Sequence, residues 1–144
     1  MRPIDNQKII IHSADHALAA LSVADEMGVG VTLLSASGAA AYLGAVVFRD
    51  MVLVAREAYP GVKVTAVLDC GDDPGLALGA MRHGVGAVSI SNIPEIRAKL
   101  RDIADQRGVL VYEKDGPVLD LIDMTNPLAA IRAWLCEPEE AQLE

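Results

Sequence analysis

The feature that most constrains the fold is a regular alternation of short apolar segments with longer segments of helical periodicity. It is clearest in residues 62–92, VKVTAVLDCGDDPGLALGAMRHGVGAVSISN. This stretch contains an apolar strand, an acidic glycine-containing turn, a helix, a second glycine turn and a second apolar strand. Short apolar runs of this kind are typical of strands in a parallel sheet. The alternation therefore predicts an α/β fold.

The same pattern extends along the chain. Predicted strands cover residues 8–12, 31–35, 63–68, 86–90 and 109–113, and predicted helices cover 14–27, 39–59, 74–82, 94–107 and 128–135. Residues 118–122, VLDLI, alternate in polarity, which predicts a half-exposed edge strand or an extended arm. We expect one three-layer α/β domain over residues 1–144, flavodoxin-like or Rossmann-like, with a mostly parallel five-stranded sheet and helices on both faces. Its core would span residues 7–113, followed by a C-terminal arm and helix (114–136) and an acidic tail (137–144).

Residues 39–59 allow two interpretations. The segment has a nearly continuous apolar surface, which favours one long helix ended by Pro60-Gly61. Alternatively, residues 45–48 form a short additional strand between two short helices. We favour the single helix, because no turn residues follow the four-residue run.

Composition excludes several classes of partner. The net charge of −8 and the five aromatic residues argue against a nucleic-acid platform, which needs basic side chains and stacking rings. The longest apolar region is interrupted by Arg49, Asp50, Arg56 and Glu57, so we expect no membrane span. Two cysteines and the lack of an export signal at the N-terminus predict a cytoplasmic protein with reduced thiols.

Candidate site residues follow from where strands should end. Parallel α/β sheets bind ligands beyond the carboxyl ends of their strands. With the strand order 2-1-3-4-5, the ends of the first and third strands lie side by side. That order would bring one group of polar residues, at His12, Ser13, Asp15 and His16, close to a second group at Asp69, Cys70, Gly71, Asp72 and Asp73. The same edge of the sheet would also carry Ser35, Ser37, Gly38, Ser91 and Asn92 as ligand-binding candidates.

Two chemistries and one structural role are predicted for this cluster. His12 could activate Cys70 as a nucleophile, with Asp69 as a third candidate catalytic residue, but neighbouring carboxylates raise a thiol's pKa. The histidines, cysteine and aspartates could hold a metal ion. Helix capping by Ser13 or Asp15 explains part of the same set, and we expect neither a metal nor a cofactor.

Two further turns have both a functional and a structural interpretation. Residues 35–38 could form an anion cradle at a helix start, although simple capping by Ser37 is favoured. Asp72 or Asp73 is expected to cap the helix that begins at Pro74.

A partial family resemblance covers residues 64–103. The helix ALGAMRHG (77–84), the short strand 87–90 and the turn Asn92-Ile-Pro94-Glu95 resemble the second half of a response-regulator receiver domain. The phosphorylation residues of that family are absent. Asp15 stands alone where the family has an acidic pair, Asp50 lacks the loop that follows the phosphoacceptor, and Ser91-Asn92 replaces the lysine turn. The resemblance implies a receiver-like fold without phosphotransfer.

The function expected from the sequence is a non-catalytic cytoplasmic regulatory module that binds a small molecule or a protein. One alternative is a small-molecule enzyme that uses His12, Asp69 and Cys70, which requires His12 within hydrogen-bond reach of Cys70 or Asp69. A second alternative is a structural oligomerisation domain. The apolar surface around Tyr42, Val46, Val47 and Met51 predicts a homo-oligomer.

Overall fold

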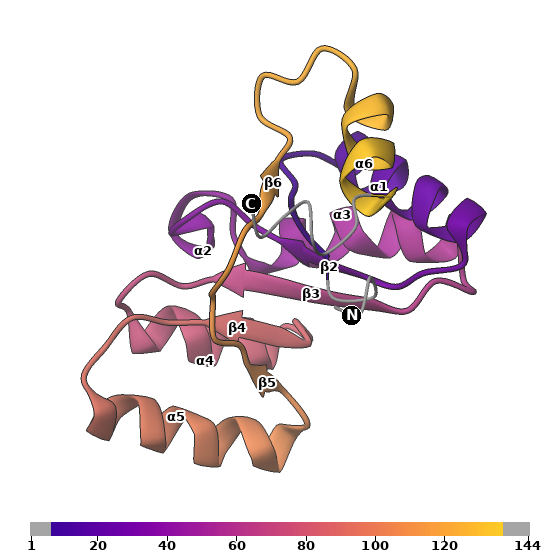
Figure 1. The fold of residues 1–144 in the computed structure, drawn as a ribbon. Helices are drawn as coiled ribbons and strands as arrows, with labels where there is room; N and C mark the ends of the chain where they lie inside the picture. The colour runs from indigo at the N-terminus through magenta and orange to yellow at the C-terminus, as the bar shows by residue number, and fades with distance from the viewer. Residues whose placement is uncertain (1–6, 137–144) are drawn as a thin grey trace.

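The computed structural model describes residues 7–136, which form a six-stranded, all-parallel sheet with helices between the strands (Figure 1). The predicted α/β fold with a parallel sheet is confirmed. The strands are β1 (Lys8–Ile10), β2 (Val31–Leu34), β3 (Val64–Asp69), β4 (Ala87–Ser89), β5 (Leu110–Val111) and β6 (Leu119–Asp120). The helices are α1 (Ala14–Met27), α2 (Ala39–Tyr42), α3 (Ala45–Ala58), α4 (Pro74–Arg82), α5 (Pro94–Arg107) and α6 (Pro127–Cys136).

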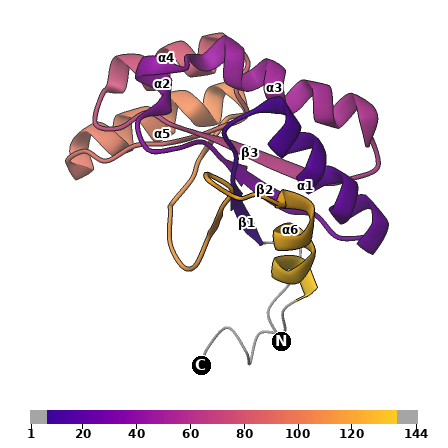
Figure 2. The ribbon, with the colours of Figure 1, turned by 90° about the horizontal axis from the view of Figure 1, so that it is seen from above.

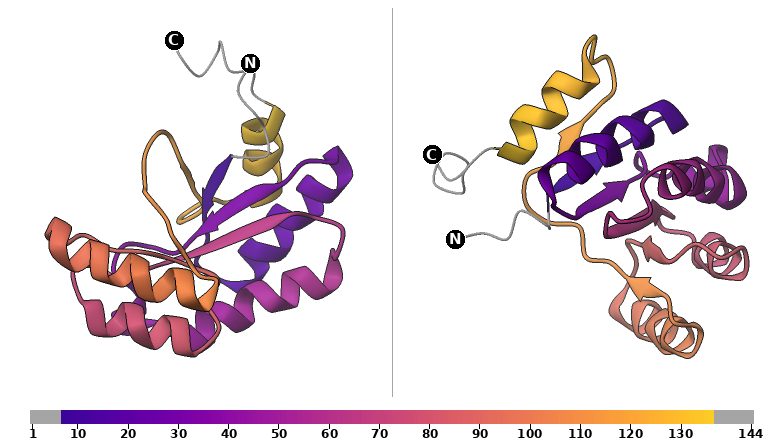
Figure 3. Two further views of the ribbon diagram at one scale, coloured as in Figure 1. Left: turned by 90° about the horizontal axis from the view of Figure 1, so that it is seen from below. Right: turned by 90° about the vertical axis from the view of Figure 1, so that its right-hand side faces the viewer.

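The predicted strand order is wrong. The observed order is β5-β4-β3-β2-β1-β6, so β1 lies between β2 and β6, and β2 separates β1 from β3. When parallel strands follow one another in sequence order, right-handed crossovers place all the connecting helices on the same side. Helices α1, α3, α4 and α5 accordingly lie along one face (Figure 3), which differs from the flavodoxin-like distribution over two faces. Sequential parallel strands with helices on one side are also the arrangement of βα-barrels.

The two faces of the sheet are packed differently. Strand residues such as Ile9, Leu33 and Leu68 join the helices in one large hydrophobic cluster. The opposite face carries a second, smaller cluster made by Ile10, Leu34, Val67, Ala87 and Tyr112. In place of helices, residues 112–118, which we call the crossing segment, lead from β5 over this face to β6 (Figures 2 and 3).

Both interpretations of residues 39–59 are wrong in detail. The region forms two helices, α2 and α3, and residues 45–48 are helical, so there is no additional strand there. The break occurs at Gly44, whose φ of 88° and ψ of 156° are not helical and favour glycine. This break lets α3 turn Phe48 and Val52 into the core while Val46, Val47, Leu53 and Val54 stay exposed.

The C-terminal helix is confirmed, and the predicted arm forms an edge strand, so the sheet has six strands where five were predicted. Strand β6 extends the sheet beyond β1, with Ile9 opposite Leu119 and Ile10 opposite Asp120. Helix α6 packs against α1 and buries Ile131 and Leu135. The predicted acidic tail, residues 137–144, lies outside the described residues. Among the helices within residues 7–136, none has the length and apolar character needed to cross a membrane.

Candidate functional site

Asp69, the last residue of β3, is the hub of a polar cluster on the face of the sheet opposite the helices. Its Oδ1 accepts hydrogen bonds from the backbone N–H groups of Gly38 (2.7 Å) and Gly71 (2.9 Å). Its Oδ2 accepts from Ser89 Oγ (2.9 Å) and from Lys114 Nζ (2.6 Å). The residue is only 8% exposed. Four donors from four segments therefore hold one nearly buried carboxylate in a single orientation.

Two glycines make this arrangement possible. Gly38 and Gly71 both have positive φ, 67° and 61°, a backbone conformation that other residues adopt only with strain. In this conformation each turn directs its N–H group at Oδ1 of Asp69. Ser35, which directly follows β2, holds the backbone of the same residue, because its Oγ accepts the backbone N–H of Asp69 at 2.9 Å.

The charge of Asp69 is stabilised despite its burial. Desolvation by burial raises the pKa of the carboxyl, but the hydrogen bonds from Lys114, Gly38, Gly71 and Ser89 oppose this effect and exceed it. The net result is a pKa below the ordinary aspartate value. At neutral pH Asp69 is therefore a fixed anion that can accept hydrogen bonds and cannot act as a proton donor.

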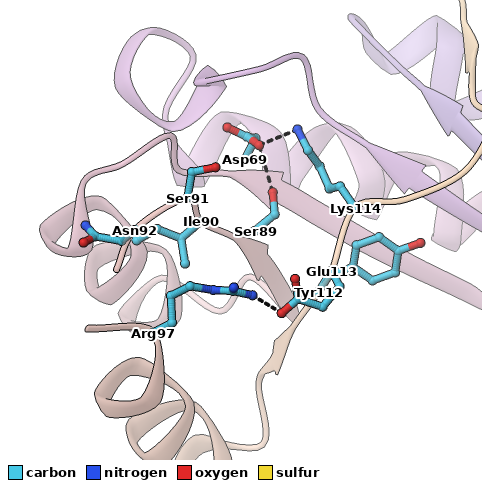
Figure 4. A pocket seen from close by; sticks show the side chains of 9 residues that line it. All are labelled: Asp69, Ser89, Ile90, Ser91, Asn92, Arg97, Tyr112, Glu113 and Lys114. Carbon is cyan, nitrogen blue, oxygen red and sulfur yellow. Dashed lines mark hydrogen bonds and ion pairs between the residues drawn. The ribbon is translucent and has the colours of Figure 1, made fainter. Parts of the chain in front are cut away.

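A pocket of about 330 Å³ opens beside Asp69 at the carboxyl ends of β3, β4 and β5 (Figure 4). Asp69 and Ser89 lie on one side of it with Lys114, and Arg97 of α5 lies on the other side with Glu113. The remaining lining residues are Ile90, Ser91, Asn92 and Tyr112. The pocket is thus predominantly polar and carries two cations and two carboxylates.

The crossing segment forms one wall of the pocket and is held in place by two lysine–carboxylate pairs. Lys114 of the segment pairs with Asp69 of the sheet, and Lys8 of β1 pairs with Asp115 of the segment at 3.1 Å. A smaller cavity of about 130 Å³ lies under the segment between these two pairs. The position of Lys114 therefore depends on a chain connection that runs across the whole sheet.

The predicted convergence of His12 with the residues after β3 is wrong. Because β2 lies between β1 and β3, His12 is next to β6 instead, and its Nε2 lies 2.6 Å from Asp120 Oδ1. His16 Nδ1 accepts the backbone N–H of His12 at 3.0 Å, so both histidines belong to the β1–β6 end of the sheet. Burial and the neighbouring His12 lower the pKa of His16, although Asp120 and Asp15 oppose this effect.

Cys70 does not form the predicted nucleophile–base pair with His12. Its side chain faces the helices, in the main core, and is 1% exposed. Burial, together with the charges of Asp69 and Asp73, raises the pKa of the thiol to about 12. Asp69 and Cys70 are adjacent in sequence but lie on opposite faces of the sheet, as successive strand residues do. The thiol is a core residue and is protonated at neutral pH.

Several of the other candidates have structural roles. Ser13 caps α1 by accepting from His16 N at 3.1 Å, and Asp73 caps α4 by accepting from Gly75 N at 2.8 Å. Asp15 is exposed in the first turn of α1. The expected capping by Ser37 is wrong, because the N-cap of α2 is Gly38, which offers no side-chain cap, and Ser37 is exposed.

The turns after β3 and β4 are joined to each other. Ser91 N donates to Gly71 O at 2.8 Å, and Asn92 Nδ2 donates to Asp72 O at 2.9 Å. The Asp72 residue itself is exposed. Among residues 7–136, no group of three or more histidine, cysteine or acidic side chains is placed to hold a metal ion.

The structure thus unites Asp69, Gly71, Ser35, Gly38, Ser91 and Asn92 of the predicted set. It adds residues that the sequence interpretation missed: Ser89, Arg97, Tyr112, Glu113 and Lys114. Tyr112, Glu113 and Lys114 come directly after β5, so the rule that ligands bind beyond strand ends could have found them. Ser89 is the last residue of β4, but the sequence predicted that this strand runs to residue 90, and Arg97 lies inside a helix, where no local pattern distinguishes it.

In comparisons with known proteins, this chain is similar to parts of two proteins. No protein-family model matches the chain. It is 29% identical over 89 residues to a class 2 fructose-bisphosphate aldolase of Synechocystis sp., covering 62% of this chain and 25% of that protein. A crystal structure of a protein assigned as a fructose-1,6-biphosphate aldolase of Coccidioides immitis matches with a TM-score of 0.60 and 18% identity. That match covers 87% of this chain and 52% of the other. This chain therefore spans about a quarter of the Synechocystis protein and about half of the Coccidioides protein. What it shares with the solved structure is the fold.

Proposed function

We propose that this chain is a ligand-binding α/β module and that its ligand is a small hydroxylated anion, such as a sugar phosphate, held in the pocket beside Asp69. The observation that carries the proposal is the fixed Asp69 carboxylate with Lys114 and Ser89 at its side. The acceptor positions of this carboxylate are filled by the protein, so its role is to orient Ser89 and Lys114 beside the pocket. Lys114, whose side chain is 41% exposed, can donate to a ligand oxygen at the same time.

The location and size of the pocket support this proposal. It lies at the carboxyl ends of parallel strands, where ligands bind in both open α/β sheets and βα-barrels. Its volume of about 330 Å³ is at the lower end of the range typical of small-molecule sites. Its lining is predominantly polar, which suits a hydroxylated and charged ligand better than an apolar one.

An enzyme acting on a sugar phosphate is the second candidate. It is favoured by the 89-residue match to an aldolase whose name identifies fructose bisphosphate as its substrate. The original enzyme hypothesis, with His12 activating Cys70, plays no part in it, because the two side chains lie apart. Any catalysis would have to use the pocket groups, of which Lys114 beside the ionised Asp69 is the candidate for proton transfer.

Calorimetric titration with fructose 1,6-bisphosphate, fructose 6-phosphate and fructose tests the binding proposal. We expect wild type to bind the phosphorylated sugars and Lys114→Gln to bind them at least about tenfold more weakly, since a hydrogen bond to a charged group is lost. Lys99→Gln is the matched control, because Lys99 is an exposed residue of α5. Failure of both phosphorylated sugars to bind would refute the proposal. Cleavage of either sugar, followed by NMR, would instead select the enzyme candidate.

We also propose, as a separate property, that the protein is cytoplasmic and self-associates along α3. The exposed Val46, Val47, Leu53 and Val54 support this contact, because they lie together on the outer surface of the helix. Light scattering of wild type and Val54→Glu tests it. We expect the variant to shift the mass towards the monomer, and a monomeric wild type would refute the proposal.

A further inference from the structure

We infer that Arg97 and Arg101 form a subsite for the phosphate group of the ligand, and that Glu113 occupies this subsite when no ligand is bound. The inference rests on the proposed function. It goes further by assigning a different part of the ligand to each side of the pocket. Ser89 and Lys114, both held by Asp69, would contact the hydroxylated part. The two arginines would contact the phosphate, because Arg97 lines the other side of the pocket (Figure 4) and Arg101 donates to the same oxygen of Glu113 as Arg97 does.

The two arginines already act as one anion-binding unit. Arg97 and Arg101 are four residues apart on α5, so their side chains extend from the same face of the helix. The NH2 groups of both donate to the same oxygen, Oε1, of Glu113. Two cations thus converge on one carboxylate oxygen supplied by the crossing segment.

The donors of this unit exceed what Glu113 uses. One carboxylate charge faces two guanidinium charges, which leaves a net charge of +1 in a chain whose overall net charge is −8. The Nε of Arg97 is buried and has no hydrogen-bond partner among the described residues. A phosphate monoester brings up to two negative charges and three acceptor oxygens, which matches paired guanidinium groups better than a single carboxylate does.

Glu113 is the carboxylate of the pocket that can be displaced. Its side chain is 55% exposed and lies outside the strands, in the crossing segment. Asp69, in contrast, has an 11% exposed side chain and accepts four hydrogen bonds from the protein. An exposed ion pair is weak because water competes for both partners. An incoming phosphate can therefore replace Glu113 but not Asp69.

The decisive variant is Glu113→Gln, which removes the competing charge and keeps the size of the side chain. We expect it to bind fructose 6-phosphate more tightly than wild type, by roughly threefold, because no carboxylate has to be displaced. Arg97→Gln and Arg101→Gln should each bind it at least about tenfold more weakly. Affinity for fructose, which carries no phosphate, should be the same in all four proteins.

Glu57→Gln is the matched control for net charge, because Glu57 is exposed on α3. Gluconate, a carboxylate of similar size, tests the ligand class. The inference requires that Glu113→Gln increase the affinity for fructose 6-phosphate more than the affinity for gluconate. Circular dichroism melting of every variant separates weak binding from misfolding.

The outcomes separate this inference from the proposed function. If fructose 6-phosphate binds wild type and Lys114→Gln weakens it, while Glu113→Gln and Arg101→Gln bind as wild type does, the subsite is refuted and the proposed function stands. Weaker binding by a folded Glu113→Gln also refutes the subsite. If neither wild type nor Glu113→Gln binds fructose 6-phosphate or fructose 1,6-bisphosphate, both proposals fail together.

Discussion

Replacing Asp69 by asparagine is the most informative change, because it keeps the shape of the side chain and removes its charge. Asparagine Oδ1 can still accept from Gly38 and Gly71, although bonds to a neutral oxygen are weaker. The amide nitrogen would replace Oδ2 and face two groups that now donate to it. The hydroxyl of Ser89 can turn and accept a hydrogen bond from the amide, but the ammonium group of Lys114 cannot accept one. The buried charge-assisted bonds are therefore the main loss.

The size of the effect follows from these four contacts. A hydrogen bond to a charged group contributes about 1.5–3 kcal/mol, and the contribution of Lys114 must be reduced because its side chain is 41% exposed. We expect the free energy of unfolding to fall by about 2–3 kcal/mol at pH 7. That corresponds to a decrease in Tm on the order of 6–10 °C for a domain of this length. Asp72→Asn, an exposed neighbour with the same charge change, should alter stability by less than about 0.5 kcal/mol.

The pH dependence gives the stronger test. The pKa of Asp69 is lower in the folded protein than in the unfolded chain, so its charge stabilises the fold above the unfolded value of about 3.9. This contribution is lost as the pH falls towards the folded pKa. Urea denaturation at pH 7, 5 and 3 should therefore show a constant difference between wild type and Asp69→Asn down to about pH 5 and a smaller one at pH 3. An unchanged difference at pH 3, or a variant as stable as wild type at pH 7, would refute the reasoning.

Three further predictions concern other residues. Asp73→Ala should lower the free energy of unfolding by about 1 kcal/mol in urea denaturation, because α4 loses its N-cap; equal loss in Asp72→Ala would contradict this. At pH 8 a thiol reagent should modify the exposed Cys136 and leave Cys70 unmodified until the protein unfolds, as mass spectrometry of the peptides would show; rapid labelling of native Cys70 would refute its burial. Asp120→Asn should cost about 1 kcal/mol, since the bond to His12 is weakened, and should speed amide exchange in β6 but not in β4.

Local sequence signals predicted the helices and their ends well. Gly28 and Gly108 end α1 and α5 in left-handed conformation, and Pro74 and Pro94 stand at the first positions of α4 and α5. These features depend on the backbone preference of one residue and on bonds to residues a few positions away, so the sequence contains them directly. Gly44 is a signal of the same local kind, but the continuous apolar surface of residues 39–59 favoured one helix across it.

Strand order could not be obtained from the same signals. The sequence of β3 alternates Thr65, Val67 and Asp69 on one face with Ala66 and Leu68 on the other, and this alternation is the same whichever strand lies beside it. Which strands lie side by side depends on hydrogen-bond pairing across the sheet and on the route of the connecting segments. Both involve residues far apart in the sequence. The error placed His12 near Asp69, although β2 lies between them.

The sequence by itself determined the class of fold, most helix boundaries, and half of the polar cluster, because Asp69, Gly71 and Ser35 mark strand ends by local chemistry. Only the tertiary structure decided which strand ends meet, that the crossing segment brings Lys114 to Asp69 across 45 positions of sequence, and that Glu113 faces two arginines of α5. The physical reason is that a lysine or a glutamate is an ordinary surface residue in its own segment. Its role arises from the partner that chain topology places within hydrogen-bond distance.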